Sequence, residues 1–227
     1  NAQFDYKFKF LDGLRANLIL GLDISTTTGW NITDEGSEVS YHNKVENGTG
    51  VWENYTQLRR DQTLELYLAY AKELKEIQSR FDILAGYSWQ HFYNQTTNDK
   101  MSNDGNDTRL YGDPTLYKTE SFLVSFYGRL NYSLMDRYLL TFTLRDDGTS
   151  RFQNNKWGLF PSAALAWRIS EEPFMKNVDW LSNLKLRLGY GITGQQNINQ
   201  GDYPSIPTYH TNQAGSLYQL GNTAITP

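Results

Sequence analysis

Apolar and polar residues alternate with a period of two along several stretches of the chain. Over residues 121–132 the even positions include Phe122, Phe126 and Leu130, while the odd positions include Ser125 and Arg129. A period of two is typical of a β-strand with one apolar and one polar face. The same alternation recurs in residues 14–22, 81–89, 140–145, 162–169 and 184–191. The chain is therefore predicted to be all-β, with about eight strands.

Residues 62–78 fit two secondary structures. Leu64, Leu66 and Leu68 follow the spacing of a strand, whereas Leu64, Leu68 and Ala71 follow that of a helix about as well. We predict a strand, because a second predicted strand, at residues 81–93, follows closely enough for a hairpin.

Short and long connections alternate between the predicted strands. Tight turns are expected at residues 11–13, 75–80 and 134–137, with an intermediate link at residues 170–183. Long loops rich in Asn, Asp, Gly, Thr and Ser are expected at residues 25–61, 94–118, 147–156 and 194–227. Antiparallel up-and-down strands with short turns at one end and long loops at the other are typical of transmembrane β-barrels.

A soluble β-sandwich also requires alternation, so two further features decide between the architectures. The spans at residues 121–134, 138–146 and 157–169 reach or approach the roughly 9–11 residues that cross a bilayer as a tilted strand. The central apolar faces carry no Lys or Arg, and a cation there would cost roughly 2–4 kcal/mol in hydrocarbon. Both features favour a membrane barrel.

Composition agrees with strands that have one apolar and one wet face. Aromatic residues make up 15% of the chain although only 39% is hydrophobic, and the mean hydropathy is −0.62. Tyr and Trp residues near strand ends are candidates for interfacial girdles, since their rings are amphipathic. These residues are Trp89, Tyr93, Tyr132, Tyr138, Trp157 and Trp167.

Charge and chemistry exclude several classes of function. The net charge of −4 argues against a broad basic surface for nucleic acid, and the chain has no cysteine. The three histidines share no metal-ligand spacing and are interpreted as surface or loop residues, so no metal site is predicted. A G-x-G-x-x-G pattern at residues 189–194 precedes a loop-like sequence rather than a helix, so no cofactor is predicted. No catalytic residue stands out, and an enzyme is not expected.

Five motifs in order carry a family resemblance. Residues 128–132 read GRLNY, residues 137–141 read RYLLT, and residues 144–152 read LRDDGTSRF. Residues 156–170 read KWGLFPSAALAWRIS, and residues 181–194 read LSNLKLRLGYGITG. This series resembles the SusC/RagA-type TonB-linked outer-membrane transporters of Bacteroidota. Residues 5–8 and 11–14 are also similar to a strand–turn–strand of that family.

The resemblance implies a plugged barrel of about 22 strands in the bacterial outer membrane. It implies a barrel surrounded by outer-membrane lipid that imports oligosaccharides or peptides. Import is driven by TonB acting on the plug, and a SusD-like surface lipoprotein serves as a lid. Because residues 1–227 offer only about eight strands, no plug and no terminal aromatic strand, we expect an internal segment of the barrel domain.

Two groups of residues are candidates for contacts in such a transporter. Cations on the polar face are expected to line the lumen and face the plug: Arg129, Arg145, Arg168, Lys185 and Arg187. Aromatic side chains in the long loops are expected to stack on substrate: Trp52, Tyr55, Tyr111, Tyr203 and Tyr209. For the cations the alternative is a merely solvated lumen wall, and for any one aromatic it is packing beneath its own loop.

Two rival functions remain open from the sequence. A soluble all-β, lectin-like carbohydrate-binding module would use the same alternation with its apolar faces buried against each other. An outer-membrane enzyme would need a catalytic constellation that the motifs do not supply. The importer is the function that the sequence favours.

Overall fold

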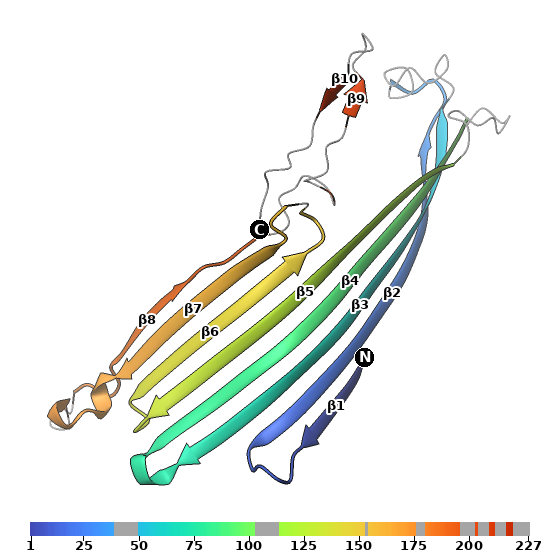
Figure 1. Cartoon of the computed structure of the whole chain (residues 1–227). Helices are drawn as coiled ribbons and strands as arrows, with labels where there is room; N and C mark the ends of the chain where they lie inside the picture. Colours follow the sequence, from blue (N-terminus) through green and yellow to red (C-terminus); the bar gives the residue numbers. More distant parts are fainter. Residues whose placement is uncertain are drawn as a thin grey trace. The chain divides into compact units, whose positions relative to one another are not determined.

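The fold is an eight-stranded sheet in which every strand pairs with its neighbour in sequence, in the order β1 to β8 (Figure 1). This computed structural model describes residues 1–38, 50–102, 114–152, 154–175, 180–195 and 203, and the backbone of residues 209–211 and 217–219. The strands are β1 (Ala2–Lys7), β2 (Leu14–Thr33), β3 (Val51–Leu74), β4 (Ser79–Ser102), β5 (Thr115–Leu134), β6 (Tyr138–Thr149), β7 (Trp157–Arg168) and β8 (Lys185–Gly191). A separate two-stranded sheet pairs β9 (Tyr209–Thr211) with β10 (Leu217–Gln219). The prediction of an all-β, up-and-down chain with about eight strands is confirmed.

The chain divides into two compact units. Unit 1 holds Asn1–Gly21, Thr63–Gln90 and Ser121–Pro227, and unit 2 holds Leu22–Gln62 and His91–Glu120. Strands β2 to β5 pass through both units. Each unit is described by itself below.

The short turns form as predicted. Met135 and Asp136 both have positive φ values, of 52° and 53°, and the Arg137 N–H donates to the Leu134 carbonyl at 3.0 Å. Two consecutive left-handed residues are the requirement of a tight hairpin whose twist matches its strands. The β3–β4 turn is a 3-10 helix, η2 (Lys75–Ile77), which ends at Gln78 in the left-handed region.

The strand prediction for residues 62–78 is confirmed through Leu74, where β3 ends. Within the described part of the chain, no helix is long and apolar enough to span a membrane. The intermediate link predicted at residues 170–183 begins one residue earlier, at Ile169, with two short 3-10 helices, η3 (Ile169–Glu171) and η4 (Pro173–Met175).

The predictions of long loops at residues 25–61 and 94–118 were wrong in extent. Strand β2 continues to Thr33, β3 begins at Val51, β4 continues to Ser102 and β5 begins at Thr115. These extensions contain Thr, Tyr and Trp residues, which favour strands, among many Asn and Gln residues. Without a clear apolar face on these extensions, the contrast that reveals a strand in the sequence is lost.

The pairing register of the strands shows which residues share each face of the unit 1 sheet. One row of cross-strand partners runs Leu130, Phe142, Ala163 and Tyr190, and the adjacent row runs Arg129, Thr143, Ser162 and Gly191. Because side chains alternate along each strand, the two rows point to opposite faces. The apolar row is exposed: Phe142 is 46% accessible and Tyr190 is 75% accessible.

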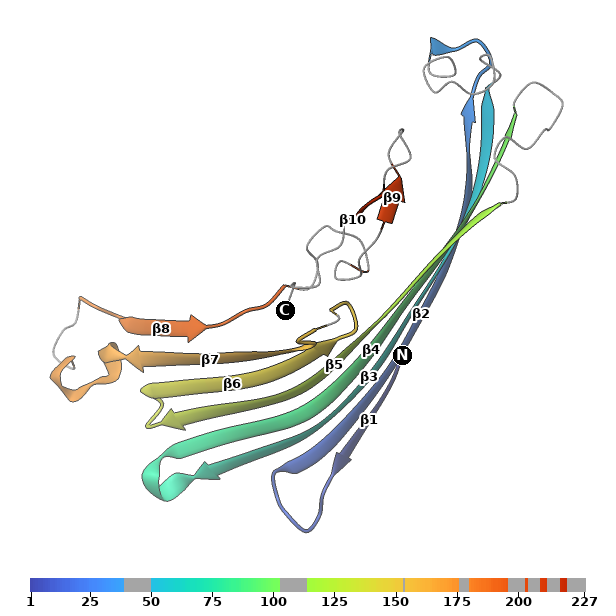
Figure 2. The same ribbon diagram turned by 45° about the horizontal axis from the view of Figure 1, so that its top comes forward.

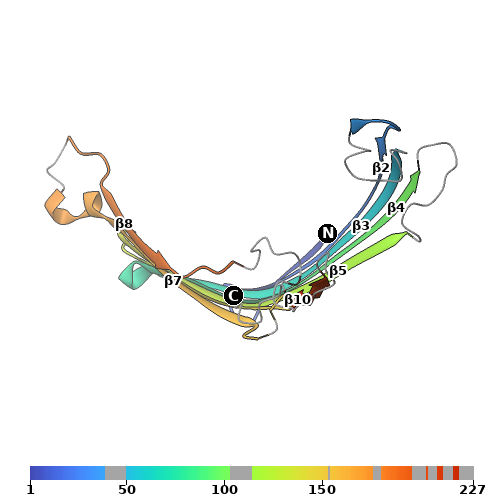
Figure 3. The ribbon, with the colours of Figure 1, turned by 90° about the horizontal axis from the view of Figure 1, so that it is seen from above.

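The unit 1 strands form one layer: β6, β7 and β8 lie side by side in Figure 2, and β7 lies next to β8 in Figure 3. Among the described residues the only buried hydrophobic residue is Phe152. A soluble sandwich would instead bury its apolar rows against a second sheet. The exposed apolar rows therefore contradict the sandwich and require an apolar medium on that face.

Candidate functional site

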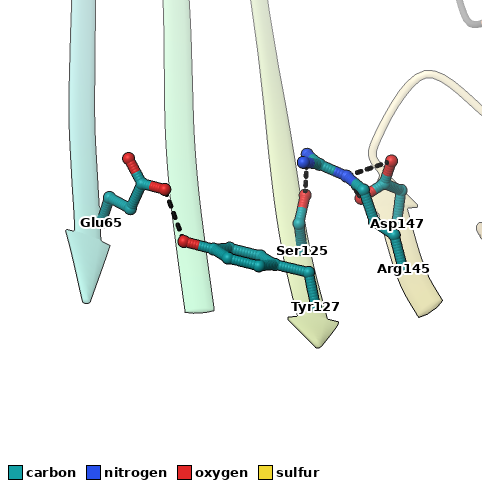
Figure 4. Close-up of polar contacts among 5 residues, drawn as sticks. All are labelled: Glu65, Ser125, Tyr127, Arg145 and Asp147. Carbon is teal, nitrogen blue, oxygen red and sulfur yellow. Dashed lines mark hydrogen bonds and ion pairs between the residues drawn. The ribbon is translucent and has the colours of Figure 1, made fainter. Parts of the chain in front are cut away.

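A polar network on the polar face of unit 1 joins residues of three strands, β3, β5 and β6 (Figure 4). Its centre is Tyr127 of β5, whose hydroxyl donates a hydrogen bond to Oε1 of Glu65 in β3. Figure 4 shows the Tyr127 ring lying across the intervening strand toward Glu65. The network thereby ties β5 to β3 over the top of β4.

Gly86 of β4 makes this bridge possible. A Cβ atom at Gly86 would lie 2.5 Å from Cζ of Tyr127, well inside van der Waals contact. Only a residue without a side chain leaves room for a ring to lie flat over the strand. The local rule is therefore a glycine on one strand matched to a tyrosine on the next.

Arg145 of β6 completes the network from the other side of Tyr127. Its Nε donates to Oδ1 and Oδ2 of Asp147 at 2.6 and 2.9 Å, and its Nη2 donates to Oγ of the fully buried Ser125 at 2.9 Å. The guanidinium carbon lies 5.8 Å from the Tyr127 ring centroid, within cation–π range. The charge of Arg145 is thus compensated within the wall itself.

The other predicted lumen cations are less engaged. Arg129, Lys185 and Arg187 are exposed, and Arg168 is half-buried, with its Nη1 donating to the Asp136 carbonyl at 3.2 Å. Arg168 and Lys185 are direct cross-strand partners, and Arg187 follows on the same face of β8. Like charges directly opposite each other are destabilising unless an anion lies between them. Within the described part of the chain, no carboxylate forms an ion pair with Lys185 or Arg187.

A cleft of about 460 Å³ lies between the β3–β4 and β5–β6 turns. The Met135 N–H donates to the Gln78 carbonyl at 2.7 Å and joins the two turns. Acidic and basic side chains both line the cleft: Glu73, Lys75, Arg80 and Asp136. It is a polar hollow at the short-turn end of unit 1.

Unit 2 repeats the glycine–tyrosine match. A Cβ atom at Gly29 of β2 would lie 2.3 Å from the Tyr55 hydroxyl, so the ring of Tyr55 lies over Gly29. Beside it, Nε2 of Gln57 donates to Oδ1 of Asn94 at 3.0 Å. An aromatic ring next to side-chain amides provides both an apolar plane and hydrogen-bonding groups.

The candidate substrate-binding aromatics have different positions in the structure. Trp52 and Tyr55 lie in β3 rather than in a loop, and as residues three apart in a strand they point to opposite faces. Tyr203 is half-buried. Tyr111 lies outside the described residues, and Tyr209 is described only as backbone in β9. Of the side chains that the structure describes, Trp52 and Tyr55 therefore do not share a face of β3.

His91 was wrongly interpreted as a surface or loop residue. It lies in β4, is only 6% exposed, and its Nδ1 and Nε2 lie 2.9 Å from Gln62 Oε1 and 2.7 Å from Glu120 Oε1. The described residues contain no group of three or more His, Asp or Glu side chains arranged to hold a metal ion. His91 joins three strands of unit 2.

Sequence reasoning missed Glu65, Gly86, Tyr127 and Asp147 as parts of the network. One signal could have indicated Tyr127, which is an aromatic residue on the polar side of an alternating strand. The partners of Tyr127 depend on how β3, β4 and β5 are aligned with one another. The alternation within each strand does not determine that alignment.

A single layer of long up-and-down strands, apolar on one face and polar on the other, is the wall of an outer-membrane β-barrel. The chain matches the family described as TonB dependent receptor-like, beta-barrel over residues 1–227. It is 42% identical to the TonB-dependent receptor SusC of Bacteroides thetaiotaomicron over 98% of this chain and 22% of that protein. It is 32% identical to the TonB-dependent receptor P3 of Formosa agariphila over 92% of this chain and 20% of that protein.

Solved structures agree on the fold. The chain superposes on the RagAB peptide transporter with a TM-score of 0.75 at 20% identity, covering 95% of this chain and 25% of that one. It superposes on the closed-closed state of the RagAB peptide importer with a TM-score of 0.74. The chain therefore belongs to the TonB-dependent receptor β-barrel family, as the motifs indicated, and is an outer-membrane protein. This family consists of receptors and transporters rather than enzymes. The chain spans about a fifth of the length of these two curated relatives.

Proposed function

We propose that this chain is part of the barrel wall of a TonB-dependent importer of oligosaccharides or peptides. The rest of the protein supplies the remaining strands and a plug domain that the TonB complex pulls on. A SusD-like surface lipoprotein covers the extracellular end. Membership of the receptor family and the likeness to a peptide transporter support this proposal.

The cations at the short-turn end of β7 and β8 carry the argument for a plug. Arg168 and Lys185 are opposed across the strands, with Arg187 two residues further along β8. This cluster of like charges needs an anionic partner, and the plug is the protein body that fills the lumen of such barrels. We assign to Lys185, Arg187 and Arg168, together with Arg129, the role of holding carboxylates of the plug.

Arg145 has a different role in this proposal. Its guanidinium is already bound by Asp147 and Ser125, so it braces the wall and offers little charge to the plug. Removing Arg145 would therefore weaken the barrel, whereas removing Arg187 would release the plug.

Substrate contact is proposed for unit 2 and the loops beyond it. Tyr55 presents a ring beside the Gln57 and Asn94 amides, a combination that suits the apolar plane and the hydroxyls of a sugar or the backbone of a peptide. Trp52, 40% exposed on the opposite face of β3, is left for another contact, such as the lid lipoprotein. Tyr111, Tyr203 and Tyr209 remain proposed substrate contacts.

The test of transport uses the full-length protein in its own bacterium. Deleting the gene should abolish energy-dependent uptake of one class of labelled oligosaccharide or peptide, and loss of TonB should have the same effect. Growth on each class then distinguishes glycan from peptide. Unchanged uptake of both classes after deletion would contradict the proposal.

The test of the plug contacts uses Lys185→Glu with Arg187→Glu. We expect the plug to loosen, seen as sensitivity to large antibiotics that the intact barrel excludes, together with reduced uptake. Lys156→Glu, an exposed cation outside this cluster, is the matched control. An unchanged plug position with unchanged uptake would assign these cations to a merely solvated lumen wall.

A further inference from the structure

The link between β7 and β8 is the only connection in the described part of the chain that contains two consecutive 3-10 helices. Helix η3 covers Ile169–Glu171 and η4 covers Pro173–Met175, drawn as orange coils at the end of β7 in Figure 2. The Glu172 N–H donates to the Ile169 carbonyl at 3.0 Å, and the Met175 N–H donates to the Glu172 carbonyl at 2.9 Å. The first half of the link is therefore a folded element rather than a slack loop.

Glu172 attaches this element to the sheet. Its Oε1 accepts hydrogen bonds from the Tyr138 hydroxyl and from Nε1 of Trp167, the latter at 2.9 Å. Arg137 Nη1 lies 3.6 Å from Glu172 Oε2. Glu172 is only 6% exposed. The hydrogen bonds from Tyr138 and Trp167, with the nearby Arg137 charge, hold the pKa of Glu172 below its ordinary value although burial opposes this.

The two rings bound by Glu172 belong to the apolar face of the sheet. Tyr138 is the cross-strand partner of Leu134 and of Trp167, and Trp167 is the partner of Leu186. The two rings are stacked, with centroids 6.4 Å apart. Because this row continues the lipid-facing rows, residues 169–175 of the link fold back on the lipid side of the wall and not into the lumen.

Large apolar side chains in the same link are left exposed. Phe174 is 65% accessible and lies two residues after Glu172, and Trp180 is 85% accessible. Exposed Phe and Trp side chains next to a lipid-facing surface are typical of an interfacial element whose rings lie at headgroup depth. The short-turn end of this class of barrel faces the periplasm.

We propose that residues 169–175 and Trp180 form an interfacial foot, in which Phe174 and Trp180 insert into the headgroup region of the periplasmic leaflet. The ligand is the glycerol and headgroup layer of phospholipid. Continuity with the lipid-facing row of Tyr138, Trp167 and Leu186 is what selects lipid over a periplasmic protein. Glu172 is the positioning residue that keeps the foot against the wall.

The test measures the depth of the foot in lipid. Single cysteines replace Phe174 or Trp180 in the full-length transporter, carry a nitroxide label and are reconstituted in phospholipid nanodiscs. Collision of each label with oxygen, which concentrates in lipid, is compared with collision with a water-soluble nickel chelate. The matched control label is at Asp12, an exposed turn residue of the β1–β2 hairpin.

We expect the ratio of oxygen to chelate collisions to be severalfold higher at residues 174 and 180 than at residue 12. Chelate access equal to that at residue 12 would place the link in water and overturn the proposal. Exclusion of both reagents would show that another protein segment covers the link, and would overturn it equally.

A second variant separates positioning from folding. Glu172→Ala should leave the barrel folded, as judged by its heat-modifiable mobility on gels, while raising the mobility of the label at residue 174 and lowering its oxygen-to-chelate ratio. An unchanged label in this variant would contradict the role of Glu172. These readouts do not depend on uptake, so they remain informative whichever substrate the protein imports.

Discussion

Among the described residues, a tyrosine ring lies over a glycine of the neighbouring strand once in each unit, with different surroundings. In unit 1 the Tyr127 hydroxyl is bonded to Glu65, and its ring lies beside the Arg145 guanidinium. In unit 2 the ring of Tyr55 lies over Gly29, and its hydroxyl has no hydrogen-bond partner among the described residues. The difference indicates that the first ring ties β5 to β3, whereas, in the described part of the chain, the second ring is not tied to another strand through its hydroxyl.

The two units also differ in the contrast between their faces. In unit 1 the exposed apolar rows face lipid. Each of them alternates with a row of polar side chains on the other face, so the two faces differ clearly in polarity. In unit 2 the strand extensions carry amides and charges, and pairs such as Lys100 with Glu53 (3.3 Å) occur between strands. A sheet face in water tolerates amide and charged side chains, whereas a row of side chains that faces lipid does not.

The largest effect is expected from charge on the lipid face of unit 1. Phe142→Arg should cost roughly 2–4 kcal/mol of stability and block assembly, because the guanidinium would lie in hydrocarbon. Thr143→Arg, on the polar face, should be tolerated. Outer-membrane fractionation and heat-modifiable gel mobility measure both, and equal tolerance would contradict the assigned faces.

Adding a methyl group beneath each tyrosine ring should show whether the ring stabilises the barrel or is free to contact a ligand. Gly86→Ala forces the Tyr127 ring off Glu65, which should lower stability by roughly 1–3 kcal/mol, as overpacking does. Gly29→Ala meets the corresponding atoms of Tyr55, but no hydrogen bond from a described residue holds the hydroxyl of that ring, so the ring can swing away and the cost should be smaller. Denaturant unfolding of the reconstituted protein compares the two, and an equal loss would show that both rings are braces.

Removing the hydroxyl of Tyr127 or of Tyr55 tests the same difference between the two rings. Tyr127→Phe deprives the Glu65 carboxylate of its donor and should cost roughly 1.5–3 kcal/mol, the range for bonds to charged groups. Tyr55→Phe should leave stability unchanged while weakening substrate uptake. The reverse pattern, with stability lost at Tyr55 and kept at Tyr127, would assign the two roles the other way round.

The smallest effect is expected at the β7–β8 link as pH falls. Because the folded-state pKa of Glu172 is lowered, its stabilising contribution is complete above the ordinary Glu value of about 4.3 and is lost as pH drops through the folded pKa. A label at residue 174 should therefore become more mobile in acid. In a Glu172→Gln background this acid step should be absent, and its persistence would place the titrating group elsewhere.

Much of unit 1 was predictable because lipid enforces a simple pattern. Its strands, the tight turn at Met135 and Asp136 and the polar placement of Arg129 and Arg187 all follow from alternation and turn chemistry. The strand extensions of unit 2 were mistaken for loops, since water on a sheet face removes the apolar signal. His91 was misjudged for a related reason, because its burial depends on Gln62 and Glu120 from neighbouring strands.

The amino-acid sequence by itself determined the all-β class, the lipid-facing rows and the family, since each depends on residue order along one strand or on motifs in series. The tertiary structure decided which side chains meet across strands. Only the register brings Tyr127 over Gly86 to Glu65, opposes Arg168 to Lys185, and directs Glu172 to two rings of the lipid face. Contacts of this kind join residues far apart in the chain, so the pattern along any single strand contains no information about them.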